Sequence, residues 1–361
     1  MQTLVLPASA ADQSRRASVL FGFFAAAALL ALGACGQEGR TRTPEGQGGD
    51  GQGSTSSGGG VGGGGGGAGG EGVGGAGGGL AGTGGLRILN WNTRNFFNDQ
   101  TDDPSGLDGP GESGLLSTSE YLVKRKVIAD VIHDLGPDIA VLQEIESQKV
   151  LDHLKLELES RGSVYPHSIL IPTKDIREIA ILSKVPFDST ETHQDEEFVA
   201  PGTFAPYFKY TRDCLEAHLT WNGRKVVILG VHFRSKVSPD DPQKRLAEAA
   251  HTRGIANGIS AADPEAGVVI LGDFNDVPGS EPYKAALGEG MGAYTNAPML
   301  ALPESSRWTY EYMGAFELID HQMSNPLLAG MLDKSSIKIL HSALAEDASD
   351  HAPVIATYDV K

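Results

Sequence analysis

The sequence has little cysteine and no apolar run long enough to span a bilayer. Only Cys35 and Cys214 are present among 361 residues, which excludes a scaffold held together by disulfides. The apolar stretch 19–32 is shorter than the roughly 20 residues of a membrane-spanning helix, so a polytopic membrane protein is excluded as well. Lys and Arg (29) are outnumbered by Asp and Glu (46), giving a formal charge of −17. This balance argues against affinity built on a broad basic face.

Glycine is abundant, but in one segment. Of the 48 glycines, 27 fall within residues 36–85, without the strict three-residue period of collagen. Such a segment buries too little apolar surface to offset the entropy of ordering its backbone, so we expect residues 35–85 to be a disordered tether. The remaining residues 86–361 have ordinary composition and carry nearly all of the negative charge. Their length suits one large domain or two small ones, and we expect a single catalytic domain.

The N-terminus has the layout of an export signal. Arg15 and Arg16 precede the apolar stretch, which ends in Leu32-Gly33-Ala34-Cys35. Small residues before a cysteine resemble the bacterial lipoprotein signal, in which the cysteine is lipidated after cleavage. We therefore expect a signal peptide over 1–34 and a lipid anchor at Cys35, at the outer membrane or cell surface; a plain cleaved signal is the alternative. Cys214 lies in an alternating strand pattern and is expected to be a buried structural thiol.

From residue 86 onward, predicted strands and helices alternate. Apolar residues at helical spacing predict helices over 120–135, 150–158 and 243–260. Alternating or short apolar runs predict strands over 87–91, 138–142, 165–171, 178–183, 207–220, 225–232, 267–272, 308–310, 317–323, 336–341 and 352–358. Because several strands follow one another directly, the order favours a layered α/β sandwich over a doubly wound parallel sheet.

Candidate catalytic side chains stand where apolar strands end. The run 138–142 leads to Glu144, the run 267–272 leads to Asp273 and Asn275, and His232 ends another strand. Asp320 and the Asp350-His351 pair add further acids and a histidine. Taken singly, each acid could be a solvated residue at a strand end and each histidine a structural one. Five such strand ends in series favour a catalytic site. Hard carboxylate oxygens with little cysteine suit Mg²⁺ or Mn²⁺ rather than structural zinc.

The series of motifs resembles the endonuclease/exonuclease/phosphatase superfamily, whose branches include DNase I, exonuclease III-type enzymes and sphingomyelinases. The residues that carry the resemblance are Trp91-Asn92, Gln143-Glu144, Val231-His232, Gly272-Asp273-Phe274-Asn275, Ile319-Asp320-His321 and Ser349-Asp350-His351. The resemblance covers essentially all of residues 86–361. It implies a four-layered α/β sandwich, with two packed mixed sheets flanked by helices and the site at one end.

The resemblance also implies roles for individual residues. Glu144 is similar to the principal metal-binding glutamate, with Asn92 and Asp350 nearby. The catalytic set is expected to comprise His351, Asp320, Asp273, Asn275 and His232. Of these, His351 is similar to a histidine paired to the Asp320 carboxylate, and Asp273 with Asn275 to the pair that orients the attacking water. Either His351 or Asp273 could take the proton from water. Glu178 is a candidate partner for His232, or else part of an exposed strand edge.

The substrate class is less determined, because loops differ within the superfamily. Arg234 and Lys236 could meet phosphates, Trp308 could stack on a base, and Glu178 lies on the same expected cleft. Each could equally be a solvated or core residue. The Asp- and Gly-rich segment 98–114 could order around Ca²⁺ or form a flexible loop. We expect a monomeric Mg²⁺-dependent nuclease; the alternatives are a diesterase or phosphatase acting on lipid or inositol phosphate headgroups, and an inactive surface binding module.

Overall fold

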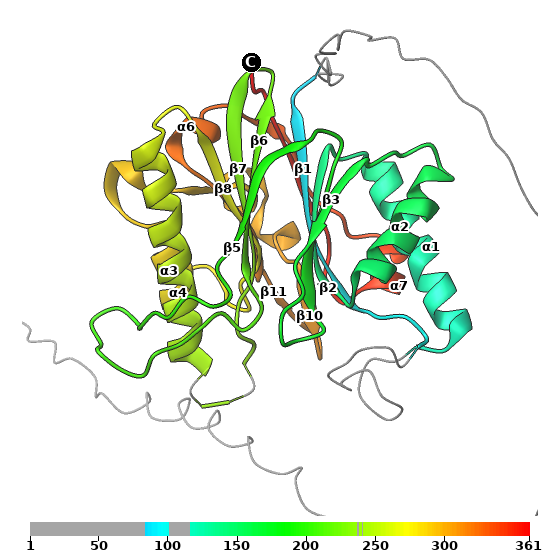
Figure 1. The fold of residues 1–361 in the computed structure, drawn as a ribbon, viewed down its shortest axis with the longest axis horizontal. Helices are drawn as coiled ribbons and strands as arrows, with labels where there is room; N and C mark the ends of the chain where they lie inside the picture. The colour runs from blue at the N-terminus through cyan, green and yellow to red at the C-terminus, as the bar shows by residue number, and fades with distance from the viewer. Residues whose placement is uncertain (1–83, 101–115, 237, 240) are drawn as a thin grey trace, which may run out of the picture. The chain divides into compact units, whose positions relative to one another are not determined.

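The computed structural model describes residues 84–100, 116–236, 238–239 and 241–361 (Figure 1). In this part of the chain two six-stranded mixed sheets pack face to face, with helices on the outer side of each. This confirms the four-layered α/β sandwich. The expected signal peptide, Cys35 and nearly all of the expected tether lie outside the described residues, as does most of the segment 98–114. No helix among the described residues is long and apolar enough to cross a membrane.

The first sheet is built around β1 and β2, which run parallel at its centre. Its strand order is β13-β14-β1-β2-β4-β3. The strands are β1 (Leu86–Phe96), β2 (Ile139–Ile145), β3 (His167–Leu170), β4 (Glu178–Ser183), β13 (Leu332–Ile339) and β14 (Val354–Tyr358). The short apolar runs of β2 and β4 are buried on both faces, as expected for central strands between a second sheet and a helical layer.

The second sheet has the order β5-β6-β7-β8-β12-β9. Its strands are β5 (Phe187–Thr192), β6 (Cys214–Trp221), β7 (Arg224–His232), β8 (Gly267–Asp273), β9 (Thr295–Asn296) and β12 (Asp320–Ser324). A separate hairpin joins β10 (Tyr310–Tyr312) to β11 (Ala315–Glu317). Cys214 is buried and free, as expected.

Most helices of the described residues form the two outer layers, whereas the short helices that begin at Ala297 and Pro326 pack against the central core. The helices are α1 (Thr118–Leu135), α2 (Gln148–Glu159), α3 (Asp241–Ala262), α4 (Glu281–Leu287), α5 (Ala297–Ala301), α6 (Pro326–Ala329) and α7 (Ala343–Ala348). In α1, Ser117 and Glu120 satisfy each other's backbone N–H groups in a capping box, and Gly136 ends the helix in the left-handed conformation. α1, α2 and α7 cover the first sheet, and α3 and α4 cover the second (Figure 1).

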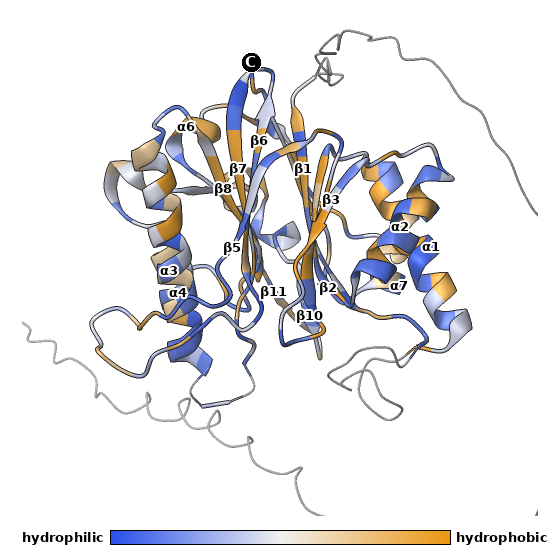
Figure 2. Ribbon diagram, viewed as in Figure 1, coloured by the Kyte–Doolittle hydropathy of each residue, from blue (hydrophilic) through white to orange (hydrophobic). Residues whose placement is uncertain are grey.

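Three apolar cores separate the layers. The central core lies between the inner faces of the sheets and includes Ile88, Val141, Ile228 and Leu271. The other two cores lie between each sheet and its helices. Figure 2 shows the apolar residues concentrated along the strands and on the inward sides of the helices. The central core ends before the strands do, which leaves polar residues facing one another at one end of the sandwich.

Several predicted boundaries differ from the structure. β1 continues to Phe96, and the predicted strand 207–220 begins only at Cys214. β5 was not predicted, because Phe187–Thr192 is polar and mostly exposed at the sheet edge and lacks an apolar alternation. The short helices α4–α7 were also not predicted, because four to seven residues show too little helical period.

Candidate active site

The site lies where the inner faces of the two sheets meet beyond the central core. In the second sheet, His232 is paired with Asp273 and Asp273 with Asp320, so three polar side chains lie side by side on three neighbouring strands. Asn92 faces them from β1 of the first sheet. Because alternate residues of a strand share a face, Ile228 before His232 and Val269 and Leu271 before Asp273 fill the central core, and the last position of each strand is polar.

Glu144 reaches this site through an irregularity in β2. Leu142 of β2 packs against the helices on the outer face, so regular alternation would send Glu144 outward too. The pairing of β2 with β4 instead shifts register between Gln143 and Ile145, and Glu144 has a φ of 64°. A bulge of this kind re-aims the side chain. The sequence correctly marked Glu144, but the strand period alone would have pointed it away from the site.

Asn275 also depends on an unusual backbone. β8 ends at Asp273, and Asn275 has a φ of 52°, so strand alternation is not what places the two side chains together. Instead, Asn275 N donates to Asp273 Oδ1 at 2.7 Å and Asn275 Nδ2 donates to the Phe233 carbonyl at 3.0 Å. Gly272 precedes them with a φ of 150°, and a Cβ there would lie 1.8 Å from the Val231 carbonyl oxygen. Only glycine allows β7 and β8 to approach this closely.

His351 is held by contacts from both sheets. Its Nδ1 lies 2.8 Å from Asp320 Oδ2, which is the pairing expected from the sequence. The Trp91 indole N–H donates to the His351 carbonyl at 2.8 Å, and the Tyr310 ring lies 4.9 Å from the imidazole. These contacts fix the ring so that Nε2 faces Asp273, at 3.9 Å from Oδ2.

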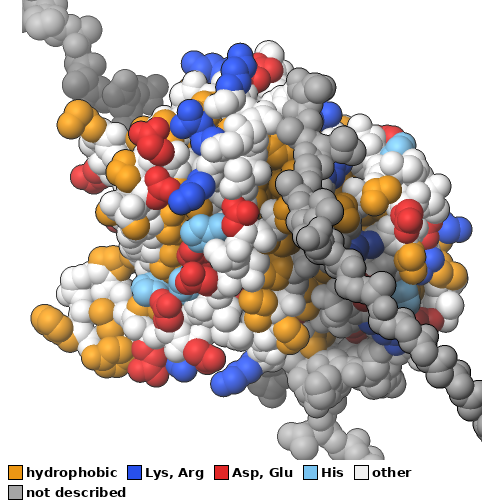
Figure 3. Space-filling model, turned by 45° about the horizontal axis from the view of Figure 1, so that its top comes forward, with side chains coloured by type: hydrophobic (Ala, Val, Ile, Leu, Met, Phe, Trp, Pro, Cys, Tyr) orange, Lys and Arg blue, Asp and Glu red, His pale blue; other side chains and the backbone are white. Residues whose placement is uncertain are grey.

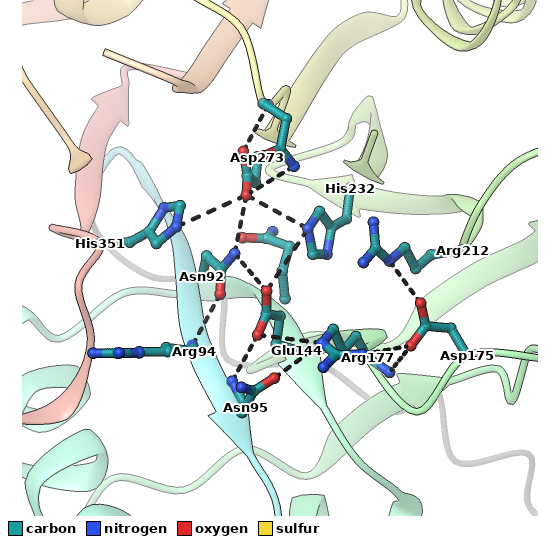
Figure 4. Close-up of polar contacts among 12 residues, drawn as sticks. Asn92, Arg94, Asn95, Glu144, Asp175, Arg177, Arg212, His232, Asp273 and His351 are labelled. Carbon is teal, nitrogen blue, oxygen red and sulfur yellow. Dashed lines mark hydrogen bonds and ion pairs between the residues drawn. The ribbon is translucent and has the colours of Figure 1, made fainter. Parts of the chain in front are cut away.

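Asp273 is the centre of the site (Figure 4). Its Oδ2 accepts a hydrogen bond from Asn92 Nδ2 at 3.0 Å and lies 3.5 Å from His232 Nε2. The same Asn92 amide donates to Glu144 Oε1 at 3.3 Å, and His232 Nε2 lies 3.9 Å from that oxygen. Asn92 and His232 therefore bridge the two carboxylates, one from each sheet.

Burial and nearby charges shift the pKa values of the two histidines in opposite directions. Burial lowers the pKa of His351, but the charge and hydrogen bond of Asp320 outweigh burial and raise the pKa to about 10. Burial lowers the pKa of His232 well below its usual value, and the nearby Arg212 charge lowers it further. Burial and the Asp320 charge raise the pKa of Asp273. His351 is thus a protonated imidazole that can donate a proton, and His232 is neutral. Asp273 is a carboxyl group made more basic by its surroundings.

The donor set suits a hard divalent cation. Asp273, Asp320 and His351 present ligand atoms within 4.8 Å of one another, and Glu144 adjoins them through Asn92. Asp320 Oδ1 and Asp350 Oδ1 are buried without a hydrogen-bond partner. Carboxylate oxygens left unpaired in this way fit a cation that prefers oxygen ligands. Of the expected metal ligands, Asn92 and Glu144 are in contact, whereas Asp350 is turned to Arg94, whose Nε lies 3.4 Å from Asp350 Oδ2.

The expected substrate-binding residues are largely engaged elsewhere. Arg234 Nε donates to Asp241 Oδ1 at 2.6 Å, and Lys236 Nζ lies 3.5 Å from Glu317 Oε2. The Trp308 ring is stacked on His341 with centroids 3.8 Å apart, so one of its faces is covered. These residues satisfy local charge and packing before any substrate is present.

Glu178 does not make the contact expected with His232. Its Oε1 accepts from Thr173 N at 2.7 Å, while Oε2 and His232 Nδ1 are each buried without a hydrogen-bond partner. Burial raises the pKa of Glu178 to about 8. Glu178 is therefore a buried carboxyl group beside the site rather than an exposed strand edge.

Sequence reasoning missed a group of basic and amide residues around Glu144. Asn95 N donates to Glu144 Oε2 at 2.7 Å, and Arg177 Nε donates to Asn95 Oδ1 at 3.0 Å and lies 4.0 Å from Glu144 Oε2. Asp175 lies between Arg177 and Arg212, 3.2 Å from each (Figure 4). The position of Arg177 directly before the β4 strand was the available signal. The turn at Asn95, with a φ of 45°, had none.

The chain belongs to the Endonuclease/Exonuclease/phosphatase family, whose sequence profile matches residues 89–351. It is therefore a metal-dependent hydrolase of phosphate ester bonds. No curated protein matches the chain in sequence.

Solved structures share the fold. The catalytic domain of human Nocturnin with bound sulfate is 15% identical, with a TM-score of 0.53, over 76% of this chain and 94% of that chain. D. rerio TDP2 complexed with a single-stranded DNA product is 17% identical, with a TM-score of 0.52, over 76% of this chain and 99% of that chain. An endonuclease/exonuclease/phosphatase from Bacteroides vulgatus is 16% identical, with a TM-score of 0.51, over 76% and 99%.

The arrangement can carry out the steps that phosphate ester hydrolysis requires. A divalent cation bound by the carboxylates would neutralise charge on the phosphoryl oxygens. Asp273, fixed by Asn275 N, can orient water and accept its proton, and His351 can donate a proton from Nε2 while Asp320 holds its Nδ1–H. The Asn92 and Asn275 amides and the neutral His232 add hydrogen-bonding groups at the same point.

Proposed function

We propose that the chain is a Mg²⁺-dependent nuclease that hydrolyses phosphodiester bonds by in-line attack of water. The observation that carries this proposal is a pocket of about 530 Å³ next to the catalytic histidine. Its lining includes Asp350 and His351 together with the aromatic residues Trp308 and Phe316. A phosphodiester at His351 would thus have aromatic rings beside it, which is the arrangement that stacks a flanking base.

The solvent exposure of the two aromatic rings indicates which one would stack on a base. Trp308 is packed between His341 and Phe316, whereas Phe316 is 59% exposed. Phe316 would therefore offer its face to the base, with Trp308 supporting it from behind. The single-stranded DNA product named for D. rerio TDP2 supports a nucleic acid substrate on this fold.

The distribution of surface charge favours contact with only a few phosphates of the substrate. Figure 3 shows Lys and Arg side chains scattered over one face of the domain rather than gathered in a continuous track. The basic residues that contact the site carboxylates are Arg177, 4.0 Å from Glu144, and Arg94, 3.4 Å from Asp350. We therefore expect few phosphate contacts and a shallow salt dependence of binding.

The second candidate is a diesterase acting on lipid headgroups. The β10–β11 hairpin exposes Tyr312, Met313 and Phe316, of which Met313 is 87% exposed. An apolar hairpin at the rim of the site could lie against a lipid surface and bring a headgroup to His351.

The test uses the full chain and several substrates in parallel. Plasmid DNA, RNA, sphingomyelin and a bis-aryl phosphate would each be incubated with and without Mg²⁺. We expect Mg²⁺-dependent cleavage of nucleic acid, with loss of activity on chelation. Hydrolysis of sphingomyelin without cleavage of DNA or RNA would favour the headgroup diesterase, and no hydrolysis of any substrate would favour an inactive binding module.

The cellular address is a separate part of the proposal. We propose that residues 1–34 are a lipoprotein-type signal, that Cys35 is the lipidated residue and that residues 35–85 tether a monomeric domain at the outer membrane or cell surface. Arg15-Arg16, the short apolar stretch and Leu32-Gly33-Ala34-Cys35 support this. Cys35→Ser should move the protein from the membrane fraction to a soluble fraction with the same specific activity. A mutant that stays in the membrane fraction would refute the anchor.

A further inference from the structure

A second cluster of histidines and carboxylates lies on the opposite side of the second sheet from the active site. It contains Glu191, His193, Glu196, Glu216, His218 and His251. Glu216 is paired with Leu229 of β7, whose side chain belongs to the core under α3. His232 follows Leu229 by three residues on β7, so it points to the other face. The cluster therefore shares no residue and no face of the sheet with the catalytic group.

Strand register brings the core of this cluster together. Glu191 of β5 is directly opposite Glu216 of β6. His218 lies two residues after Glu216 on β6 and therefore on the same face, and His193 directly follows β5 with its Nε2 3.0 Å from Glu216 Oε2. Oxygen atoms of Glu191 and Glu216 and a nitrogen of His193 lie within 4.8 Å of one another, and His218 Nε2 contacts Glu216 Oε1.

Both ring nitrogens of His193 face carboxylate oxygens. Nδ1 lies 2.8 Å from Glu196 Oε1 and Nε2 lies 3.0 Å from Glu216 Oε2. A neutral imidazole can donate from only one nitrogen. If Nδ1–H donates to Glu196, the lone pair of Nε2 meets the lone pairs of Glu216, and a cation must lie between them: either a second proton on the ring or a metal ion.

The surroundings of His193 are those of a metal-ligating histidine. A ligating imidazole commonly donates its other N–H to a carboxylate, which fixes the tautomer. Glu196 has this position and is itself held by His251, whose Nε2 lies 2.7 Å from Glu196 Oε2. His251 is in turn stacked on Phe198 with centroids 4.4 Å apart. Asp213, 3% exposed, accepts from His193 N at 2.9 Å and adds further buried negative charge.

We propose that Glu191, His193 and Glu216, whose ligand atoms lie within 4.8 Å of one another, bind one Zn²⁺ ion, with Glu196 orienting His193 and with His218 turning from its contact with Glu216 to supply the fourth ligand. Two imidazole nitrogens and two carboxylate oxygens form a tetrahedral set that zinc accepts and that Mg²⁺, which prefers oxygen ligands in an octahedron, does not. Tetrahedral ligands at 2.0–2.1 Å are roughly 3.3 Å apart, so the 3.0 Å between His193 Nε2 and Glu216 Oε2 needs to open by only a few tenths of an ångström. The ion would fasten the edge strand β5 and the segment after it to β6 and α3.

The test measures zinc binding directly. The full chain, stripped with chelator, would be dialysed against Zn²⁺ in excess Mg²⁺ and its bound zinc measured by atomic spectroscopy. We expect one zinc equivalent that Mg²⁺ does not displace. Glu191→Gln and His218→Gln should each weaken its binding by about tenfold or more, since each removes a ligand while retaining volume. These two positions are partly exposed, so the variants should fold.

Two controls separate this site from others. His133→Gln removes a histidine at the end of α1 and should bind zinc like the parent. Glu144→Gln alters the active site and should also retain this zinc equivalent. X-ray absorption of the zinc form should show only nitrogen and oxygen ligands.

Three results would overturn the proposal: no zinc retained by the parent, equal retention by Glu191→Gln and the parent, or sulfur in the coordination sphere. The first would identify the cluster as a protonated His193 held between Glu196 and Glu216.

Discussion

The two histidine and carboxylate clusters differ in how completely their buried polar atoms are paired. Around the active site, Asp320 Oδ1, His232 Nδ1 and Glu178 Oε2 are buried without a partner. In the cluster around His193, each nitrogen of that ring is within 3.0 Å of a carboxylate oxygen. Unpaired buried polar atoms cost stability and are retained where a ligand completes them. The unpaired atoms of the first cluster suit a ligand that exchanges, whereas the zinc ion proposed for the second cluster would link its strands permanently.

The largest expected effect comes from the Asp320–His351 pair. Asp320→Asn keeps the shape but removes the charge that holds His351 protonated at Nδ1. We expect kcat to fall by about 10³–10⁴-fold, and the free energy of unfolding to fall as well, because the buried His351 loses its charged partner. Steady-state kinetics and thermal unfolding would measure both. Asp333→Asn, at a partly exposed carboxylate on β13, is the control, and a fall below tenfold would argue against a catalytic role for the pair.

Glu144→Gln should produce the next largest loss. It removes one ligand charge and keeps the side-chain volume, so we expect kcat/KM to fall by about 10²–10³-fold and the Mg²⁺ concentration for half-maximal activity to rise. Activity titrations against Mg²⁺ would measure this, with Glu265→Gln as the exposed control. Parent activity that persists in excess chelator would refute the metal dependence of this site.

Glu178 should make stability depend on pH. Its pKa is raised from 4.5 to about 8 by burial, so the folded chain holds a proton there that the unfolded chain has released. This contribution is fully present below about pH 4.5 and is lost as pH rises through about 8. The free energy of unfolding of Glu178→Gln minus that of the parent should therefore rise by roughly 2–4 kcal/mol as the pH is raised from 5 to 9. Denaturant unfolding at several pH values would measure it. For the control Glu281→Gln, at an exposed position, this difference should not change with pH. The same result for Glu178→Gln would contradict the prediction.

Glu216→Gln tests the second cluster by its effect on folding. Removing the charge between His193 and His218 should lower the free energy of unfolding by about 1–3 kcal/mol, because two histidines lose a charged partner. Activity per folded molecule should be retained. Denaturant unfolding and kinetics on the same preparation would compare the two. A loss of turnover without a loss of stability would mean that the clusters are coupled.

The smallest effect is expected for the two basic residues after β7. Because Arg234 is bonded to Asp241, Arg234→Ala should change stability more than DNA binding. Lys236, whose side chain is 48% exposed, should change the slope of log affinity against log salt by at most about 0.9. Binding to duplex DNA at several salt concentrations would measure this. A larger change for Arg234→Ala would show that its pairing with Asp241 opens when substrate binds.

Much of the fold could be predicted from the chain itself. The strand 178–183 has the predicted bounds, and the helices at 120–135 and 243–260 are each within two residues of the observed ones, because apolar periodicity is strong in long or fully buried elements. The polar edge strand β5 could not be found this way, since its position depends on pairing with β6. The second cluster was missed for the same reason: half of its residues lie on or directly after β5.

The sequence alone determined which side chains stand at the strand ends, and the series from Asn92 to His351 is sufficient to indicate the family. Only the tertiary structure decided how they are aimed. Regular strand alternation would point Glu144 away from the site, and the bulge in β2 turns its side chain into it. Asp320 contacts His351, which lies 31 residues away in the chain. The pairing of Arg234 with Asp241 likewise follows from folding. Local periodicity reports burial, but direction and partner are set by contacts between segments distant in the chain.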